Sequence, residues 1–482
     1  MKRAALVVIA ACAADAPERP PPKWIADTST FEPAHTTPIA DRYRTVAARI
    51  VAAARIDRGA YDKLSELADR IGHRLSGSPE LDRAIAWAVR ALGDDGLDAR
   101  TEKVMVPHWV RGAEDAALVA PIARPLRIIG LGGTVGTPKG GVDAPVVVVH
   151  DWKELEAAGD RVRGAIVLYD VAMPAWSEEH GSGYGKVVEF RWQGATRAAK
   201  QGAVGVLMRS VTAHSLRTPH TGAMGYDDKV TKIPAAAISI EDAELIDRLA
   251  KRGAVTVHLH LESQQLPDAE SANVIGELRG SDRPDEVVVI GGHIDSWDVG
   301  QGAHDDGAGI VTMMEALAVL KKLGLQPRRT IRAVLFTNEE NGLRGGRAYA
   351  EHHKDELART VLAIEADSGG FTPRGFTLGA PTAAALAHMR ARFADIVTLL
   401  APIGATKLTS EGHTGGADIA PMAPAGVPQA GLEVDNRTYF DIHHTDADTL
   451  DKVDPQQLAD DVAAIAVVAY IVADLPDRLD AP

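Results

Sequence analysis

The chain has 482 residues, of which 45% are hydrophobic and 24% charged, and its formal net charge is -14 at pH 7. This composition is that of an ordinary globular protein and excludes a disordered or fibrous one. The acidic balance argues against a nucleic-acid partner, because phosphate backbones are bound by clustered Lys and Arg. The length exceeds what one hydrophobic core usually organises, so we expect two domains, one inserted into the other.

The first residues have the features of an export signal. Two basic residues precede the apolar run Ala4–Ala11, which is too short to span a bilayer. Cys12, the only cysteine, follows directly and resembles the lipidated cysteine of a bacterial lipobox. We assign residues 1–40 to this signal and a proline-rich tether, and expect a periplasmic or cell-surface protein whose only membrane contact is a lipid anchor at Cys12. Ordinary signal cleavage and a buried cysteine are the alternatives.

Residues 41–110 are predicted to be mostly helical and to form the first part of the main domain. Apolar residues recur at helical spacing, as in Val46, Ile50 and Val51. Ser78 followed by Pro79 suits the N-cap and first position of a helix after a Gly-rich loop.

Residues 111–267 change to Gly-rich turns and compact apolar runs, such as Ala165–Tyr169 and Val204–Met208, which are typical of strands. Amphipathic stretches such as Glu241–Arg252 lie between them. This pattern predicts a small mixed α/β domain inserted into the chain.

Residues 268–482 alternate strand-like and helical segments and form the rest of the main domain. Val287–Ile290, Ile331–Thr337 and Val361–Glu365 are predicted strands, and Asp306–Leu323 is a predicted helix. The order favours an α/β fold with a doubly wound mixed sheet. In such sheets ligands bind beyond the carboxyl ends of the strands, so the polar residues found there are candidates for function.

Residues of the metal-ligand type follow each of these strands. The set combines imidazoles and carboxylates without thiolates, which suits a catalytic zinc site with open positions rather than a closed structural site. Two metals close together need a bridging carboxylate, and a nearby carboxylate must carry the proton. The candidates are His293 and Asp295, Glu339 and Glu340, Asp367, His304 to Asp306 at a helix start, and His443 and His444 further along.

Each candidate also has a simpler explanation. Asp305 and Asp306 suit N-caps of the following helix, Glu339 and Glu340 suit a solvated loop, and isolated histidines are usually surface or core residues. The conjunction of five ligand-type positions in one α/β segment favours a metal site over these explanations.

The motifs resemble those of the M28 family of zinc peptidases, and within it the carboxypeptidase Q group. The run Gly-His-Ile-Asp-Ser-Trp-Asp-Val-Gly-Gln-Gly at 292–302 and the Asp-Asp-Gly at 305–307 carry the resemblance most specifically. It also covers 74–78, 107–109 and 215–222, and so extends from about Asp41 to the C-terminus.

The resemblance implies two Zn²⁺ ions and a role for each candidate. It makes His293 and Asp367 ligands of one ion, Glu340 and His444 ligands of the other, and Asp305 the bridge. Glu339 becomes the general base, and Asp295 the carboxylate that orients His293. His443 is the weaker alternative to His444. The inserted segment looks like a protease-associated domain, and the loop at 412–418 suggests His413 and Gly415 as substrate-binding residues.

The expected activity is that of a zinc-dependent exopeptidase hydrolysing dipeptides or terminal residues of short peptides. A metal-free binding or receptor protein on the same scaffold and a glutaminyl cyclase are the alternatives. The sequence does not decide which peptide end is recognised, the side-chain preference, or whether the protein forms a homodimer.

Overall fold

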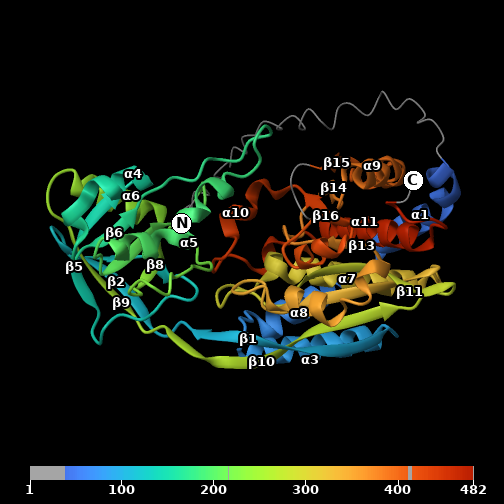
Figure 1. Cartoon of the computed structure of the whole chain (residues 1–482), viewed down its shortest axis with the longest axis horizontal. Helices are drawn as coiled ribbons and strands as arrows, with labels where there is room; N and C mark the ends of the chain where they lie inside the picture. The colour runs from blue at the N-terminus through green and yellow to red at the C-terminus, as the bar shows by residue number, and fades with distance from the viewer. Residues whose placement is uncertain (1–37, 215, 411–414, 481–482) are drawn as a thin grey trace, which may run out of the picture.

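The computed structural model describes residues 38–214, 216–410 and 415–480, which form two lobes joined by two long strands (Figure 1). The export signal, Cys12 and the proline-rich tether lie outside the described residues. So does His413.

The N-terminal helices pack against the larger lobe. They are α1 (Pro38–Ile56), α2 (Gly59–Glu66) and α3 (Pro79–Asp94). The Oγ atom of Ser78 accepts a hydrogen bond from the backbone N–H of Leu81 at 3.2 Å, and Pro79 is the first residue of α3, which confirms the predicted cap.

The larger lobe is built on a mixed eight-stranded sheet whose strands have the order β1-β10-β12-β11-β13-β16-β14-β15. The four strands β12, β11, β13 and β16 run parallel, and the pairs β1·β10, β10·β12 and β14·β16 are antiparallel. The strands are β1 (Asp98–Val110), β10 (Gln264–Leu278), β11 (Arg283–His293), β12 (Arg329–Phe336), β13 (Thr360–Glu365), β14 (Pro373–Gly379), β15 (Lys407–Thr409) and β16 (Gln429–Val434).

Helices cover both faces of this sheet, so the predicted doubly wound α/β fold is confirmed. Alternate residues of β11 enter different cores: Val288 and Ile290 pack with α7 and α11, and Val287 and Val289 pack beside α8. The helices of this lobe are α7 (Ala308–Lys322), α8 (Arg344–His352), α9 (Ala383–Val397), α10 (Tyr439–Ile442) and α11 (Pro455–Asp474).

The helix α11 is long and apolar, and its place in the fold decides what it does. By length and composition α11 could cross a membrane, but 83% of its apolar window is buried inside the fold. It is therefore the core helix of the larger lobe, which contacts α1 and α7.

The smaller lobe contains a second eight-stranded sheet, with the order β3-β2-β9-β5-β6-β7-β8-β4. Its strands β5, β6, β7 and β8 are parallel neighbours, with α4 and α5 packed on one face and α6 on the other. Its elements are β2 (Glu114–Ala120), β3 (Arg124–Leu126), β4 (Ile128–Gly130), β5 (Val142–Val149), α4 (Trp152–Ala158), β6 (Ile166–Tyr169), α5 (Val188–Lys200), β7 (Gly205–Arg209), β8 (Ala235–Ile238), α6 (Ile240–Ala250) and β9 (Thr256–Leu261).

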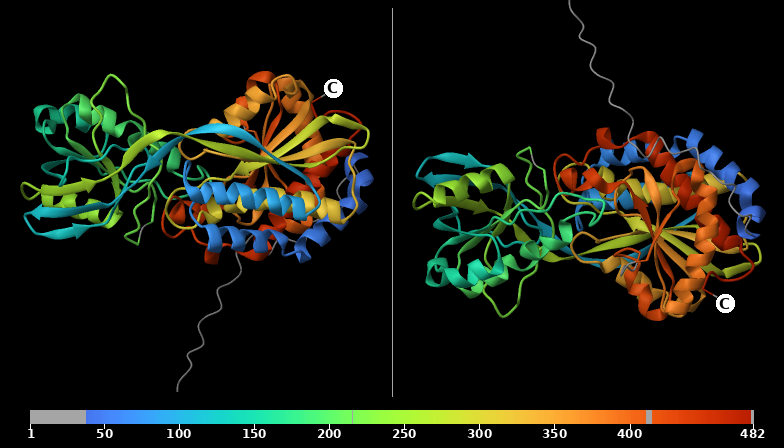
Figure 2. Two further views of the ribbon diagram at one scale, coloured as in Figure 1. Left: turned by 90° about the horizontal axis from the view of Figure 1, so that it is seen from below. Right: turned by 90° about the horizontal axis from the view of Figure 1, so that it is seen from above.

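The long antiparallel strands β1 and β10 connect the lobes (Figure 2). Their pairing runs from Asp98 opposite Glu277 to Val110 opposite Gln264. Pro267, the predicted end of the inserted segment, lies within β10. Because the chain enters and leaves the smaller lobe along one ribbon, that lobe is held beside the carboxyl ends of the parallel strands of the larger sheet.

Candidate metal centre

The carboxyl ends of β11, β12 and β13 bring the predicted ligands together. His293 is the last residue of β11, Glu340 lies in the loop after β12, and Asp367 lies after β13. Asp305 comes from the turn before α7, and His444 from the turn after α10. Parallel strands end at the same edge of a sheet, which explains why residues up to 151 positions apart in sequence meet.

Asp305 occupies the middle of the cluster. Its Oδ1 atom lies 3.3 Å from Nε2 of His293, and its Oδ2 atom lies 3.2 Å from Nε2 of His444. The Nε2 atom of His293 is also 3.4 Å from Asp367, and that of His444 is 3.2 Å from Glu340. The carboxylate of Asp305 therefore stands between two imidazole–carboxylate pairs, as a bridging ligand would.

The cluster is buried and rich in negative charge. In the part of the chain that the structure describes, the ion-pair partners of Asp305, Glu340 and Asp367 are histidines alone. Burial and the nearby charge of Asp305 raise the pKa of Glu340 to about 7. Burial favours neutral His444, but Glu340 and Asp305 outweigh it and raise the pKa of that imidazole to about 10. Buried carboxylates whose ion-pair partners are imidazoles, without Lys or Arg, are favourable surroundings for a metal cation.

The donor set fits zinc. Imidazole nitrogen and carboxylate oxygen are its usual ligands in catalytic sites, and the described residues here include no thiolate. The buried Oδ2 atom of Asp305 makes no hydrogen bond of regular geometry, although it faces the cluster. An oxygen in that condition is suited to a metal ion.

The two aspartates before α7 have different roles. Asp306 accepts hydrogen bonds from the backbone N–H groups of Gly309 at 3.1 Å and His293 at 3.0 Å, so it caps α7 and fixes the end of β11. Asp305 points into the cluster. Its backbone and that of His304 donate to the carboxylate of Asp448, at 3.1 and 2.7 Å.

Glu339 lines the same cavity as the ligands. Burial, together with the charges of Asp367, Glu340 and Asp295, raises its pKa well above the usual range. The backbone N–H of Glu339 donates to Oδ1 of Asp295 at 3.0 Å, which fixes the position of this residue at the end of β12. A carboxylate with a raised proton affinity beside a candidate metal site is suited to proton transfer.

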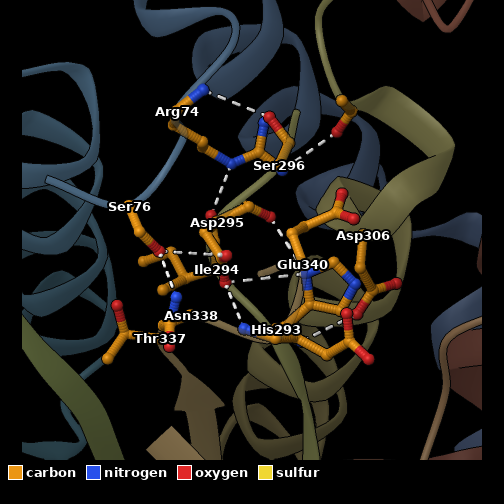
Figure 3. Close-up of polar contacts among 12 residues, drawn as sticks. Arg74, Ser76, His293, Ile294, Asp295, Ser296, Asp306, Thr337, Asn338 and Glu340 are labelled. Carbon is orange, nitrogen blue, oxygen red and sulfur yellow. Dashed lines mark hydrogen bonds and ion pairs between the residues drawn. The ribbon is translucent and has the colours of Figure 1, made fainter. Parts of the chain in front are cut away.

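Asp295 contacts His293 mainly through its backbone. The Nδ1 atom of His293 lies 3.0 Å from the carbonyl oxygen of Asp295, whereas the carboxylate of Asp295 is 3.8 Å away (Figure 3). Donation from Nδ1 to that carbonyl leaves Nε2 free to bind a metal. The carboxylate of Asp295 is instead held by Glu339 and, at 3.4 Å, by Ser76.

Residues that sequence reasoning did not single out support the loop after β11. Arg74 is fully buried, and its guanidinium donates to the carbonyl oxygen of Ile294 (Figure 3). It also donates to the carbonyl oxygens of Gln301 and Gly302. Arg74 belongs to the 74–78 segment, which carried a resemblance but no chemical role. Asp448 is 144 positions from His304 in sequence, and no motif indicated the contact between them.

His444 is better placed than His443. The Nε2 atom of His444 faces two carboxylates at 3.2 Å, whereas that of His443 reaches only Asp305, at 3.6 Å. Burial and the charge of His444 hold the pKa of His443 well below its usual range. The two rings stack with centroids 3.5 Å apart, so His443 packs against the ligand candidate.

A cavity of about 480 Å³ opens beside the cluster and is lined by both lobes. The smaller lobe contributes Gly132, Tyr184, Arg191 and Met224. The acids and histidines that the larger lobe contributes are Asp305, Glu339, Glu340, Asp367, His443 and His444. Gly415 lines a wider groove that shares Asp367 and Ser368 with this cavity. The substrate roles of Gly415 and His413 stay predictions.

Comparison with known proteins places the chain in a family. The sequence model of peptidase family M28 matches residues 273–469. Carboxypeptidase Q of Mus musculus is 43% identical over 421 residues, which cover 87% of this chain and 86% of that protein. The chain belongs to peptidase family M28. Carboxypeptidase Q of Homo sapiens, 41% identical over the same shares of both chains, agrees with this assignment.

Solved structures of M28 peptidases have the same fold. An M28 peptidase precursor from Shewanella amazonensis covers 91% of this chain and 98% of its own, with a TM-score of 0.86 and 36% identity. The zinc aminopeptidase BSAP from Bacillus subtilis covers 86% of this chain and 94% of its own, with a TM-score of 0.62 and 20% identity, which shows the fold alone. This M28 protein is a zinc-dependent exopeptidase, as the sequence predicted.

Proposed function

We propose that this M28 peptidase binds two zinc ions at the cluster around Asp305 and hydrolyses dipeptides or terminal residues of short peptides. The observation that carries the proposal is the position of Asp305, whose two oxygens face His293 and His444 at 3.3 and 3.2 Å. One zinc is assigned to His293 and Asp367, the other to Glu340 and His444. Neither a metal-free receptor nor a glutaminyl cyclase is favoured by the relatives found.

The residues of the cluster have different roles in the proposed reaction. When bound, a metal pair of this kind lowers the pKa of a water molecule and polarises the scissile carbonyl. The carboxylate of Glu339 accepts the proton of the attacking water and passes it to the nitrogen of the leaving amine. Asp295 holds Glu339 in place through its backbone N–H, and the carbonyl of Asp295 sets the tautomer of His293.

The charges of the cavity favour recognition of a free carboxylate. Its lining acids are Asp305, Glu339, Glu340 and Asp367, all of which belong to the cluster. Apart from the histidines, its lining cations are Arg191 and Arg347. Arg191 is buried and donates to backbone oxygens, whereas Arg347 of α8 is exposed and forms no ion pair with a described residue. Arg347 is therefore the cation available to a peptide's C-terminal carboxylate.

The two-zinc function is tested by metal analysis together with peptide assays. The purified protein should contain two zinc ions per chain, and a chelator should abolish hydrolysis of dipeptides until zinc is returned. Fewer than two ions after equilibration with zinc would contradict the metal assignment. Turnover that survives complete metal removal would contradict the mechanism.

Recognition of the carboxylate has its own experiment. Dipeptides with free, amidated or N-acetylated ends should be compared in the wild type and in Arg347→Gln. We expect Arg347→Gln to raise KM for free-carboxylate substrates about tenfold, since a hydrogen bond to a charged group contributes about 1.5 kcal/mol or more. Arg344→Gln, on the same helix but outside the cavity lining, is the matched control. Equal cleavage of amidated substrates by the wild type would refute this assignment.

We also propose export and a lipid anchor at Cys12, as the first residues of the sequence suggest. Mass spectrometry of the mature N-terminus of the membrane fraction tests this. Cys12→Ser should release the enzyme into the soluble fraction, and an unmodified Cys12 in the mature wild-type protein would exclude the anchor. Whether the protein forms a homodimer is open to measurement by light scattering.

A further inference from the structure

The smaller lobe holds one of the metal-ligand candidates through a pair of backbone contacts. The backbone N–H of Thr221 donates to the carbonyl oxygen of His444 at 3.1 Å, and Nδ1 of His444 lies 3.3 Å from the carbonyl oxygen of Thr221. Because a carbonyl oxygen only accepts, this contact places the proton on Nδ1 and leaves Nε2 free for a metal. Thr221 and His444 are 223 positions apart in sequence.

The backbone of His444 needs such support. Its φ angle is 61°, in the left-handed region that non-glycine residues seldom adopt. A residue in this conformation persists only where contacts with its surroundings hold it there. The two contacts with the backbone of Thr221 are among those that hold His444.

Arg191 of α5 fixes the segment 221–223. Its Nε atom donates to the carbonyl oxygen of Ala223 at 3.2 Å, and Nη1 to that of Thr221 at 3.4 Å. Nη2 donates to the hydroxyl of Tyr184 at 2.8 Å. Gly222 lies against the guanidinium with φ 137°, and a Cβ atom there would come within 2.2 Å of Nη1. The chain is therefore folded closely around this buried cation.

The smaller lobe also supports Glu340 and His444 through a second contact, which involves Trp297 of the larger lobe. The backbone of residues 222–224 pairs with Gly132, which packs so closely on the indole of Trp297 that a Cβ atom would lie 1.8 Å from it. The backbone N–H of Trp297 donates to Oε1 of Glu340 at 3.2 Å, and its ring lies 5.6 Å from that of His444.

The other half of the cluster is held differently. Apart from the pairing of β11 with β12, the hydrogen bonds and ion pairs of His293 and Asp367 within the described chain join these two residues to each other or to Asp295, Asp305 and Asp306 of the larger lobe. The smaller lobe thus supports Glu340 and His444, whereas the sheet of the larger lobe alone supports His293 and Asp367.

We propose that the inserted lobe completes the metal position formed by Glu340 and His444, and that Arg191 is a positioning residue for it. The inference rests on the proposed two-zinc function. It assigns the lobe a structural part in the metal centre, in addition to lining the cavity. The consequence is that the two zinc ions depend differently on the smaller lobe.

The test measures zinc bound per chain at graded free zinc concentrations, in the full-length wild type, Arg191→Met and Gly222→Ala. In both variants we expect one zinc ion to bind as in the wild type and the other to bind about 10–100-fold more weakly, the usual effect of losing a contact behind a ligand. Arg197→Met is the matched control, because Arg197 lies on the same helix but stacks on Trp152. It should bind both ions as the wild type does.

Thermal unfolding of each variant accompanies the metal measurement. Unchanged affinity for both ions in folded Arg191→Met and Gly222→Ala would overturn the inference, and so would parallel weakening of both ions. If Arg191→Met does not fold, Gly222→Ala decides, since it retains the guanidinium and only displaces the segment around it. A wild type that binds fewer than two ions would refute the proposed two-zinc function itself. Failure of that function can therefore be distinguished from failure of the inference about the smaller lobe.

Discussion

Two groups of His and Asp or Glu side chains lie near the carboxyl ends of parallel strands in this protein, one in each lobe. In the larger lobe His293, Asp305 and Glu340 bring ligand atoms within 4.8 Å of one another, and in the smaller lobe His150, Asp170 and Asp247 do the same. By spacing alone the two groups are equivalent.

Their charge balance differs. Asp170 is paired with Arg209 at 2.8 Å and Asp247 with Lys251 at 2.5 Å, so the group in the smaller lobe carries its own cations. His150 is 43% exposed. The carboxylates of the larger lobe have only histidines as partners and are buried. Among the described residues, the proposed metal centre therefore differs from the group in the smaller lobe by the lack of Lys and Arg partners at its buried carboxylates, and not by ligand spacing.

The largest effect is expected from Asp305, the proposed bridge. Asp305→Ala should remove bound zinc and reduce peptide hydrolysis to background, because both imidazole–carboxylate pairs lose the carboxylate that stands between them. Asp247→Asn, in the group of the smaller lobe, should leave zinc content and turnover unchanged. Elemental analysis and dipeptide assays check both. Zinc loss in Asp247→Asn would show that charge compensation does not separate the two groups.

Glu339, the proposed proton carrier, is expected to have the next largest effect. Glu339→Gln should lower kcat by about 10²–10⁴-fold, the usual contribution of a general base, while zinc content stays at the wild-type value. Glu244→Gln, which alters an acid of the smaller lobe that contacts Arg209, is the control and should keep full activity. Unchanged kcat in Glu339→Gln would remove this residue from the mechanism.

The stacked histidines give a sharper comparison within the metal centre. His444→Ala should lose one zinc ion and most activity, because Nε2 of His444 is the nitrogen that faces Asp305 and Glu340. His443→Ala should retain both ions, with a smaller loss of activity from the missing ring contact. The reverse pattern would exchange the two assignments.

Much of this centre could be predicted from sequence, because parallel strands deliver the residues that follow them to one edge. That rule covers His293, Glu340 and Asp367. It did not decide between Asp305 and Asp306, since capping a helix and facing a metal differ only by the backbone angles of that turn. Nor could it find the contact of Thr221 with His444, which depends on how the two lobes dock. Local patterns carry no information about such docking.

The smallest effect is expected at a third group of histidine and carboxylates. Unlike the proposed metal centre, this group contains an arginine. His353 contacts Glu102 through Nε2 and Glu356 through Nδ1, each at 3.0 Å, with Arg332 beside them. Burial lowers the pKa of His353, but the two glutamates outweigh it and raise the value above 6.5. The folded state therefore binds the proton more tightly than the unfolded state.

The sign of the pH dependence follows from this raised pKa. The stabilisation is fully present below the pKa of the unfolded histidine, about 6.5, and is lost as pH rises through the higher folded value. Urea unfolding between pH 6 and 9 should show that the free energy of unfolding falls by about 1 kcal/mol or less, and His353→Gln should abolish this fall.

The group around His353 resembles the group around His150 in the smaller lobe, because Arg332 provides a positive charge beside its carboxylates. Zinc content of His353→Gln should accordingly equal that of the wild type, and a reduced content would mean that compensated groups also bind the metal.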